Sequence, residues 1–126
     1  MITGIRFATI DVRDQDRALE FWTGAMGGTV QLDTPMSDDP GAARWIEVAL
    51  PGDTYLVLYD VTQGFEGADR EGPSNLWFQS DDLDATFAEL SARGVPFTVE
   101  PQQAPWDPSQ RWAQFRDPDG HLFGLS

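Results

Sequence analysis

The chain of 126 residues repeats one order of secondary-structure signals at a constant spacing of 68 positions. Asp14 and Asp82 each stand where a helical pattern begins, and an aspartate there accepts hydrogen bonds from the first free backbone N–H groups of the helix. Gly52 and Gly120 mark equivalent turns in the two halves. Repetition at a fixed period is the sequence signature of a duplicated structural unit. We therefore predict an α+β fold of two tandem βαβββ modules with one helix in each.

Apolar residues recur at strand or helix spacing along both halves. In the first half, a strand, a helix and three more strands are expected at residues 5–12, 14–26, 29–34, 44–50 and 54–61. In the second half, the same order is expected at residues 75–80, 82–93, 95–100, 111–116 and 121–125. Turn formers between the halves predict a single domain in which module one covers residues 1–63, a linker covers 64–73 and module two covers 74–126.

Charge and composition exclude several kinds of partner and site. The 21 Asp and Glu against 8 Lys and Arg give a net charge of −13, which repels nucleic acids and anionic lipid surfaces. No apolar run reaches the roughly 20 residues of a membrane span, so we expect a cytoplasmic protein. With no cysteine and one histidine, His121, the chain has no thiolate nucleophile, and any metal site would depend on carboxylates.

Four segments together resemble the vicinal oxygen chelate superfamily, also called the glyoxalase/bleomycin-resistance/dioxygenase superfamily. They are VRDQDRALEFW at 12–22, DDLD at 81–84, GV at 94–95 and FRDPDG at 115–120. The resemblance implies mixed sheets that curl around a cleft, and assembly as a homodimer. It also implies that many relatives hold one divalent metal with four residues at equivalent strand positions.

In this sequence the four metal positions of the superfamily carry unsuitable residues. They fall on Phe7, Asn75, Gly124 and Val57, or Leu56 if the turn is aligned one residue differently. A benzyl ring, an aliphatic side chain and a glycine cannot coordinate a metal, and one neutral amide is a weak anchor. We therefore expect no metal and no other cofactor.

Alternation along the strands predicts which side chains line the cleft. Aromatic walls with a few hydrogen-bonding groups are typical of sites for bulky organic molecules. The predicted ligand-binding residues share cleft-facing positions: Phe7, Thr9, Trp45, Glu47, Tyr55, Val57, Tyr59, Asn75, Trp77, Gln79, Trp112 and Gln114. Trp45 and Trp77 could instead fill a dimer interface, where aromatic residues are also enriched.

Three further features have two interpretations each. Glu47 is the candidate catalytic residue, since a carboxylate among aromatic rings holds a proton more readily, but it serves equally well as a polar anchor. His121 follows a turn and is expected to be structural rather than catalytic. Residues 101–110, rich in Pro and Gln, are expected to form a connection whose Trp106 either covers the cleft or anchors the surface.

The leading hypothesis is metal-independent binding and sequestration of a bulky aromatic small molecule, a drug or natural product, as in antibiotic resistance or self-immunity. The alternative is a metal-free cyclase, isomerase or lyase that acts on a natural-product intermediate in the same cleft. A third possibility is a glyoxalase- or dioxygenase-like metalloenzyme with displaced ligands.

Overall fold

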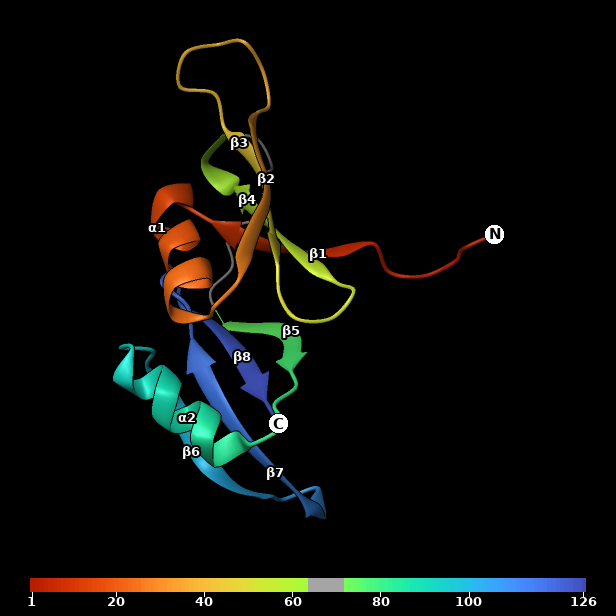
Figure 1. The fold of residues 1–126 in the computed structure, drawn as a ribbon, viewed down its shortest axis with the longest axis vertical. Helices are drawn as coiled ribbons and strands as arrows, with labels where there is room; N and C mark the ends of the chain where they lie inside the picture. Colours follow the sequence, from red (N-terminus) through yellow and green to blue (C-terminus); the bar gives the residue numbers. More distant parts are fainter. Residues whose placement is uncertain (64–71) are drawn as a thin grey trace. The chain divides into compact units, whose positions relative to one another are not determined.

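A computed structural model describes residues 1–63 and 72–126, apart from the side chains of residues 72, 73 and 75. The chain divides into two compact units, Met1–Arg70 and Glu71–Ser126 (Figure 1). The predicted linker, residues 64–73, lies almost wholly outside the described residues. No helix in the described part of the chain has the length and apolar character that a membrane crossing requires.

The first unit is a four-stranded mixed sheet with one helix. Its elements in chain order are β1 Phe7–Val12, α1 Gln15–Glu20, a π-helical turn Phe21–Ala25, β2 Thr29–Pro35, β3 Arg44–Ala49, β4 Tyr55–Asp60 and a 3₁₀ turn Val61–Gln63. The sheet order is β1-β4-β3-β2, in which β1 and β4 run parallel and the other pairs run antiparallel.

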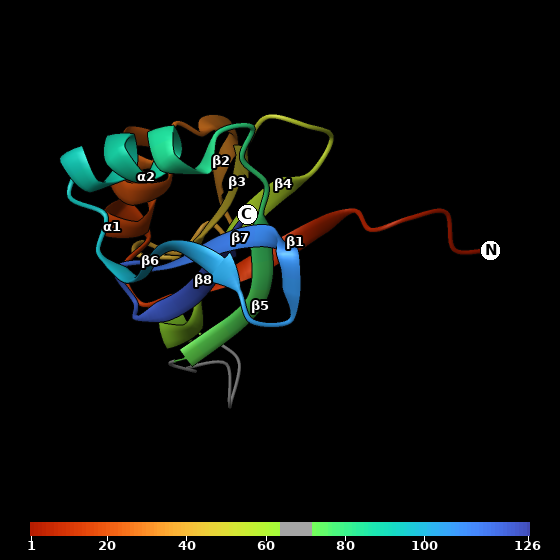
Figure 2. The ribbon, with the colours of Figure 1, turned by 90° about the horizontal axis from the view of Figure 1, so that it is seen from below.

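The second unit repeats this plan. It contains β5 Gly72–Phe78, α2 Leu83–Ala92, β6 Phe97–Ala104, β7 Asp107–Arg116 and β8 His121–Leu125. Its sheet order is β5-β8-β7-β6, again with the first pair parallel. Figure 2 shows α2 as a separate layer beside the strands, and it packs against β6 and β7. The predicted α+β fold of two βαβββ modules is confirmed.

Both predicted helix caps are confirmed. The side chain of Asp14 accepts a hydrogen bond from the backbone N–H of Arg17 at 3.1 Å, and that of Asp82 accepts one from Ala85 at 3.0 Å. Each side chain thereby satisfies one of the backbone donors that a helix leaves without an internal partner at its N-terminus.

The prediction of an irregular connection at residues 101–110 is wrong. These residues extend β6 and β7 into a hairpin in which Gln103 pairs with Arg111 and Ala104 pairs with Asp107. Pro101 is tolerated because β6 is an edge strand, where a missing backbone donor costs little. The hairpin was missed because most of its side chains are polar or exposed on both faces, so no alternation marks it.

The core of each unit lies between its sheet and its helix. In the first unit it consists of buried side chains from β1, β3, β4 and the helical segment: Ile10, Val12, Ala18, Trp22, Ile46, Val48, Leu56 and Leu58. In the second unit Phe115 and Phe123 are fully buried, with ring centroids 5.5 Å apart. The helix therefore covers one face of each sheet, and the candidate site residues lie on the other.

Candidate functional site

Seven predicted site residues share the sheet face of the first unit that is turned away from α1. Strand pairing places Thr9 opposite Val57, Val57 opposite Glu47, and Phe7 opposite Tyr55. Residues two positions apart on a strand point the same way, so the other members follow. The group on this face is Phe7, Thr9, Trp45, Glu47, Tyr55, Val57 and Tyr59.

Aromatic rings close over the middle of this face. Phe7 on β1 and Trp45 on β3 meet edge to face with ring centroids 5.7 Å apart, although β4 lies between their strands. Phe7 also contacts Tyr55, at 5.6 Å. Val57 on β4 is 0 % exposed. The position where many relatives place a metal ligand is therefore a covered valine.

Glu47 is held by two neighbouring side chains. One carboxylate oxygen accepts a hydrogen bond from the Trp45 indole Nε1–H at 2.9 Å, and the other accepts one from the Gln31 amide at 3.0 Å. A carboxylate that accepts one bond on each oxygen fixes the orientation of its donors. The contacts of Glu47 thus support an anchor that orients the Trp45 ring.

The second unit carries a tryptophan cluster, formed by Trp77 on β5, Trp106 in the β6–β7 turn and Trp112 on β7. The ring centroids lie 5.8 Å apart for Trp77 and Trp106, 5.8 Å for Trp77 and Trp112, and 5.3 Å for Trp106 and Trp112. Trp77 is 52 % and Trp106 56 % exposed. Three indoles thus gather on one surface of this unit, two of them half open to solvent.

Trp106 is the member of the cluster that the list of predicted site residues omits. Its connection to Trp112 depends on the hairpin, whose pairing brings the turn back beside β7. The signal that could have found it is the short spacing of Trp106 and Trp112 on either side of Pro108, which suits two arms of one turn.

Trp77 occupies the space that a side chain at position 124 would need. Gly124 on β8 is its strand partner, and a Cβ atom built on Gly124 would lie 2.2 to 2.6 Å from three atoms of the Trp77 indole. Atoms without a bond between them do not approach so closely, so the indole rests on the bare glycine backbone. At Gly124, another of the positions where relatives place a metal ligand, the space for a side chain is therefore filled by the indole ring of Trp77.

The metal site of the superfamily does not fit this chain. Phe7 and Trp45 cover one part of the sheet face, and Trp77 covers Gly124. The side chain of Asn75, the remaining position, lies outside the described residues. Among residues 1–63 and 72–126, no three His, Cys, Asp or Glu side chains are grouped so that they could hold a metal ion.

Substituting Gly124 with alanine should displace the Trp77 indole, because the new methyl group takes its place. Trp77 is half exposed and can turn outward, so we expect a loss of stability of about 1 kcal/mol with a large change in the near-ultraviolet circular dichroism of the cluster. Gly24→Ala is the matched control, since a Cβ there meets nothing within 4 Å. An unchanged spectrum in Gly124→Ala would contradict the contact.

A cavity of about 420 Å³ opens beside Trp77 in the second unit. Its lining residues are Trp77, Phe78, Gln79, Ser80, Gln110, Arg111 and Ser126. Small-molecule sites commonly measure some 300 to 1,000 Å³, so the volume is sufficient for an organic ring system. Gln79 and Gln110 supply amide groups at its wall, and Trp77 supplies a flat apolar surface.

Arg111, the cationic residue in this wall, is already paired. Its guanidinium donates to both carboxylate oxygens of Asp84 on α2, at 2.6 and 3.0 Å. The hydrogen bond from Arg111 holds the pKa of the Asp84 carboxyl below its usual range, and the guanidinium charge adds to this effect. The described residues that line the cavity therefore offer no free positive charge to an anionic ligand.

Removing Arg111 should reduce the contribution that Asp84 makes to the pH dependence of stability in acid. A lowered folded-state pKa adds stability above the unfolded pKa, and that contribution is lost as pH falls through the folded pKa. Arg111→Gln should therefore raise the Asp84 pKa toward 3.8 and flatten the low-pH limb of the stability curve. Carbon-detected NMR titration measures the shift, with Arg17→Gln as the control. Identical Asp84 titrations in wild type and Arg111→Gln would refute the pairing in solution.

Two predicted residues have local structural partners. Gln114 on β7 accepts a hydrogen bond from the Thr98 hydroxyl at 2.8 Å. His121 is buried, and its Nδ1 lies 3.0 Å from the carboxylate of Asp117, which also accepts the backbone N–H of His121. His121, the first residue of β8, is therefore tied to the turn that precedes this strand.

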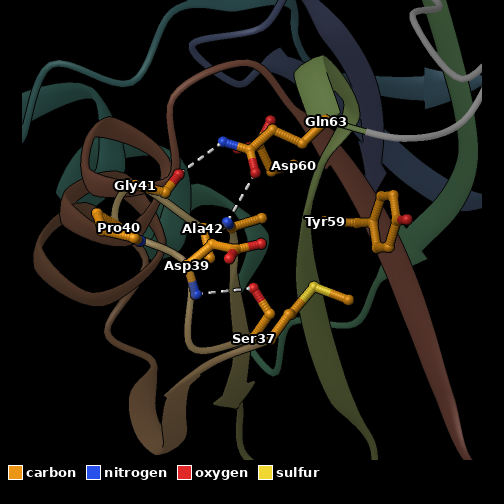
Figure 3. A pocket seen from close by; sticks show the side chains of 10 residues that line it. Ser37, Asp39, Pro40, Gly41, Ala42, Tyr59, Asp60 and Gln63 are labelled. Carbon is orange, nitrogen blue, oxygen red and sulfur yellow. Dashed lines mark hydrogen bonds between the residues drawn. The ribbon is translucent and has the colours of Figure 1, made fainter.

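The first unit has a smaller cavity of about 270 Å³, between residues 36–43 and the end of β4 (Figure 3). Gln63 fixes the loop by accepting the Ala43 N–H at 2.8 Å and donating to the Gly41 carbonyl at 3.0 Å. Of the predicted ligand-binding residues, Tyr59 lines this cavity. Neither Phe7 nor Trp45 lines this cavity, which makes it a lesser candidate than the one beside Trp77.

Known proteins resemble this chain along almost its whole length. The model of the Glyoxalase/Bleomycin resistance protein/Dioxygenase superfamily matches residues 4–125. The uncharacterized protein YetH of Bacillus subtilis (strain 168) is 34 % identical, over 99 % of this chain and 98 % of its own length.

Two solved structures extend this likeness. A superfamily member from Sphaerobacter thermophilus DSM 20745 has a TM-score of 0.81 and 33 % identity, covering 98 % of this chain and 96 % of its own. TnmS3, an antibiotic binding protein from Streptomyces sp. CB03234, has a TM-score of 0.76 and 34 % identity, covering 99 % and 95 %.

Proposed function

Because the chain belongs to the glyoxalase/bleomycin resistance/dioxygenase superfamily, and its metal positions do not fit a metal, we propose that it binds and sequesters a bulky aromatic small molecule without one. The similarity to TnmS3, which is an antibiotic binding protein, supports a drug or natural product as the ligand. A homodimer and a cytoplasmic location remain predictions from the sequence.

The tryptophan cluster is the observation that carries this proposal. Large apolar side chains that stay exposed on a small protein commonly mark a binding surface. Trp77, which lines the 420 Å³ cavity, and Trp106, which contacts Trp77, present indole faces of this kind. Indole faces stack on planar rings, and the net charge of −13 favours neutral or cationic ligands.

The enzymatic alternative rests on Glu47 as a proton carrier. Its carboxylate already accepts hydrogen bonds from Trp45 and Gln31, which suits an anchor. These contacts favour binding over turnover.

A panel of planar aromatic natural products, titrated while tryptophan fluorescence is followed, tests the proposal. We expect saturable quenching for at least one compound. After long incubation with the protein, that compound should keep its mass and its chromatographic retention time. Conversion of the bound compound would favour the cyclase, isomerase or lyase. Quenching that Trp77→Ala and Trp112→Ala both leave intact would refute the cluster as the site.

A further inference from the structure

Within the described part of the chain, the indole nitrogen of Trp112 is a buried donor without a partner. Its Nε1 is inaccessible to solvent, and it makes no hydrogen bond to any other described residue. An indole N–H can only donate, and buried donors in folded proteins nearly always have an acceptor. A donor left in this state inside a candidate binding surface indicates an acceptor that is supplied from outside.

No residue that the structure describes accepts this N–H. Gln114, two positions along β7 on the same face, has its amide oxygen engaged by the Thr98 hydroxyl at 2.8 Å. The rings that contact Trp112 are those of Trp77, tilted by 34°, and Trp106, tilted by 56°. Ring atoms of these two side chains provide no conventional acceptor.

The side chains that pack against Trp112 are also those best able to move. Trp77 and Trp106 are both more than half exposed, and exposed side chains change rotamer on fast timescales. Trp106 lies in the β6–β7 turn, outside the strand ladder. Either ring can turn outward without disturbing the buried core around Phe115.

We propose that the tryptophan cluster selects planar aromatic ligands that carry a hydrogen-bond acceptor at the ring edge. The ligand stacks on the indoles of Trp77 and Trp106, and its acceptor atom receives the Trp112 Nε1–H. This inference rests on the proposed function and adds the chemical class of the ligand. It predicts discrimination between two rings of equal size that differ in one edge atom.

Quinoline and naphthalene are such a pair, since one ring nitrogen replaces one C–H. At pH 8 quinoline is neutral, so charge does not contribute to the comparison. Protein labelled with ¹⁵N at the indoles is titrated with each probe, and Trp→Phe variants assign the five indole signals. Quinoline should move the Trp112 Nε1–H signal downfield and bind about tenfold more tightly than naphthalene.

Trp112→Phe keeps an aromatic ring but removes the donor. In this variant the ratio of quinoline to naphthalene affinity should fall from about ten to about one. Circular dichroism checks that the variant is folded. A ratio of about ten that persists in Trp112→Phe overturns the inference.

The remaining outcomes separate this inference from the proposed function. If neither probe moves the Trp77 and Trp106 signals, the cluster is not an aromatic site and the proposed function fails with it. If both probes move those signals equally and the Trp112 N–H does not respond to quinoline, only this inference is overturned. Gln102, the strand partner of Trp112, supplies a last control. A shift of the Trp112 N–H in Gln102→Leu without any probe would show that the protein itself provides the acceptor.

Discussion

Substituting Trp77 with alanine should weaken binding of a stacked aromatic ligand by roughly 30- to 150-fold, because an aromatic anchor at a binding site contributes about 2 to 3 kcal/mol. Trp77 lines the larger cavity, rests on Gly124 and contacts both other indoles of the cluster. Its removal therefore takes away the stacking surface and the support of Trp106 together. Isothermal titration calorimetry with a compound identified by quenching measures the loss.

Met36→Ala is the matched control for this experiment. Met36 is 53 % exposed, like Trp77, but it lies in the first unit beside the smaller cavity. Its removal should leave the affinity within about twofold of wild type, as for most surface substitutions. Equal losses of affinity in Trp77→Ala and Met36→Ala would contradict the placement of the binding site at the tryptophan cluster.

Substituting Gln15 with leucine should lower the free energy of unfolding by about 2 to 4 kcal/mol. The Gln15 side chain is buried at the start of α1. Its amide donates to the carbonyls of Arg44 at 2.6 Å and Leu58 at 2.9 Å, and accepts the Arg44 N–H at 3.0 Å. Leucine has a similar volume but cannot form these hydrogen bonds, so the backbone groups of β3 and β4 lose their partner.

Urea denaturation followed by far-ultraviolet circular dichroism measures the effect. Gln31→Leu is the matched control, because the Gln31 amide is exposed and donates its hydrogen bond to Glu47 at the surface. We expect that variant to stay within about 0.5 kcal/mol of wild type. A Gln15→Leu protein as stable as Gln31→Leu would show that the buried amide does not join helix to sheet as described.

The sequence was sufficient to predict the fold because its strongest signals are local. Asp14 and Asp82 act as caps wherever the rest of the chain lies, and the alternation in β1, β3 and β4 follows from burial of one face. The duplication predicted the same order of elements in the second half, and the strand order of its sheet indeed repeats that of the first.

The parts of the candidate site that were missed depend on pairing between distant residues. Trp77 covers Gly124 only because β5 and β8 meet in one register, and a shift of one residue would turn the indole to the other face. Trp106 reaches Trp112 through a hairpin of mostly polar residues, which has no apolar pattern to reveal it. Gln15 looks like an ordinary surface residue of a first helical turn until β3 and β4 are placed against it.

The contact between Trp77 and Gly124 also constrains how this protein could change in evolution. A carboxylate introduced at position 124 would collide with the indole, and an alanine at position 77 alone would remove the stacking surface without restoring a metal ligand. Neither substitution alone therefore produces a metal ligand that fits. The effect of each substitution depends on the other, so the two positions are epistatic. A metal ligand at position 124 is therefore difficult to gain one substitution at a time while Trp77 is in place.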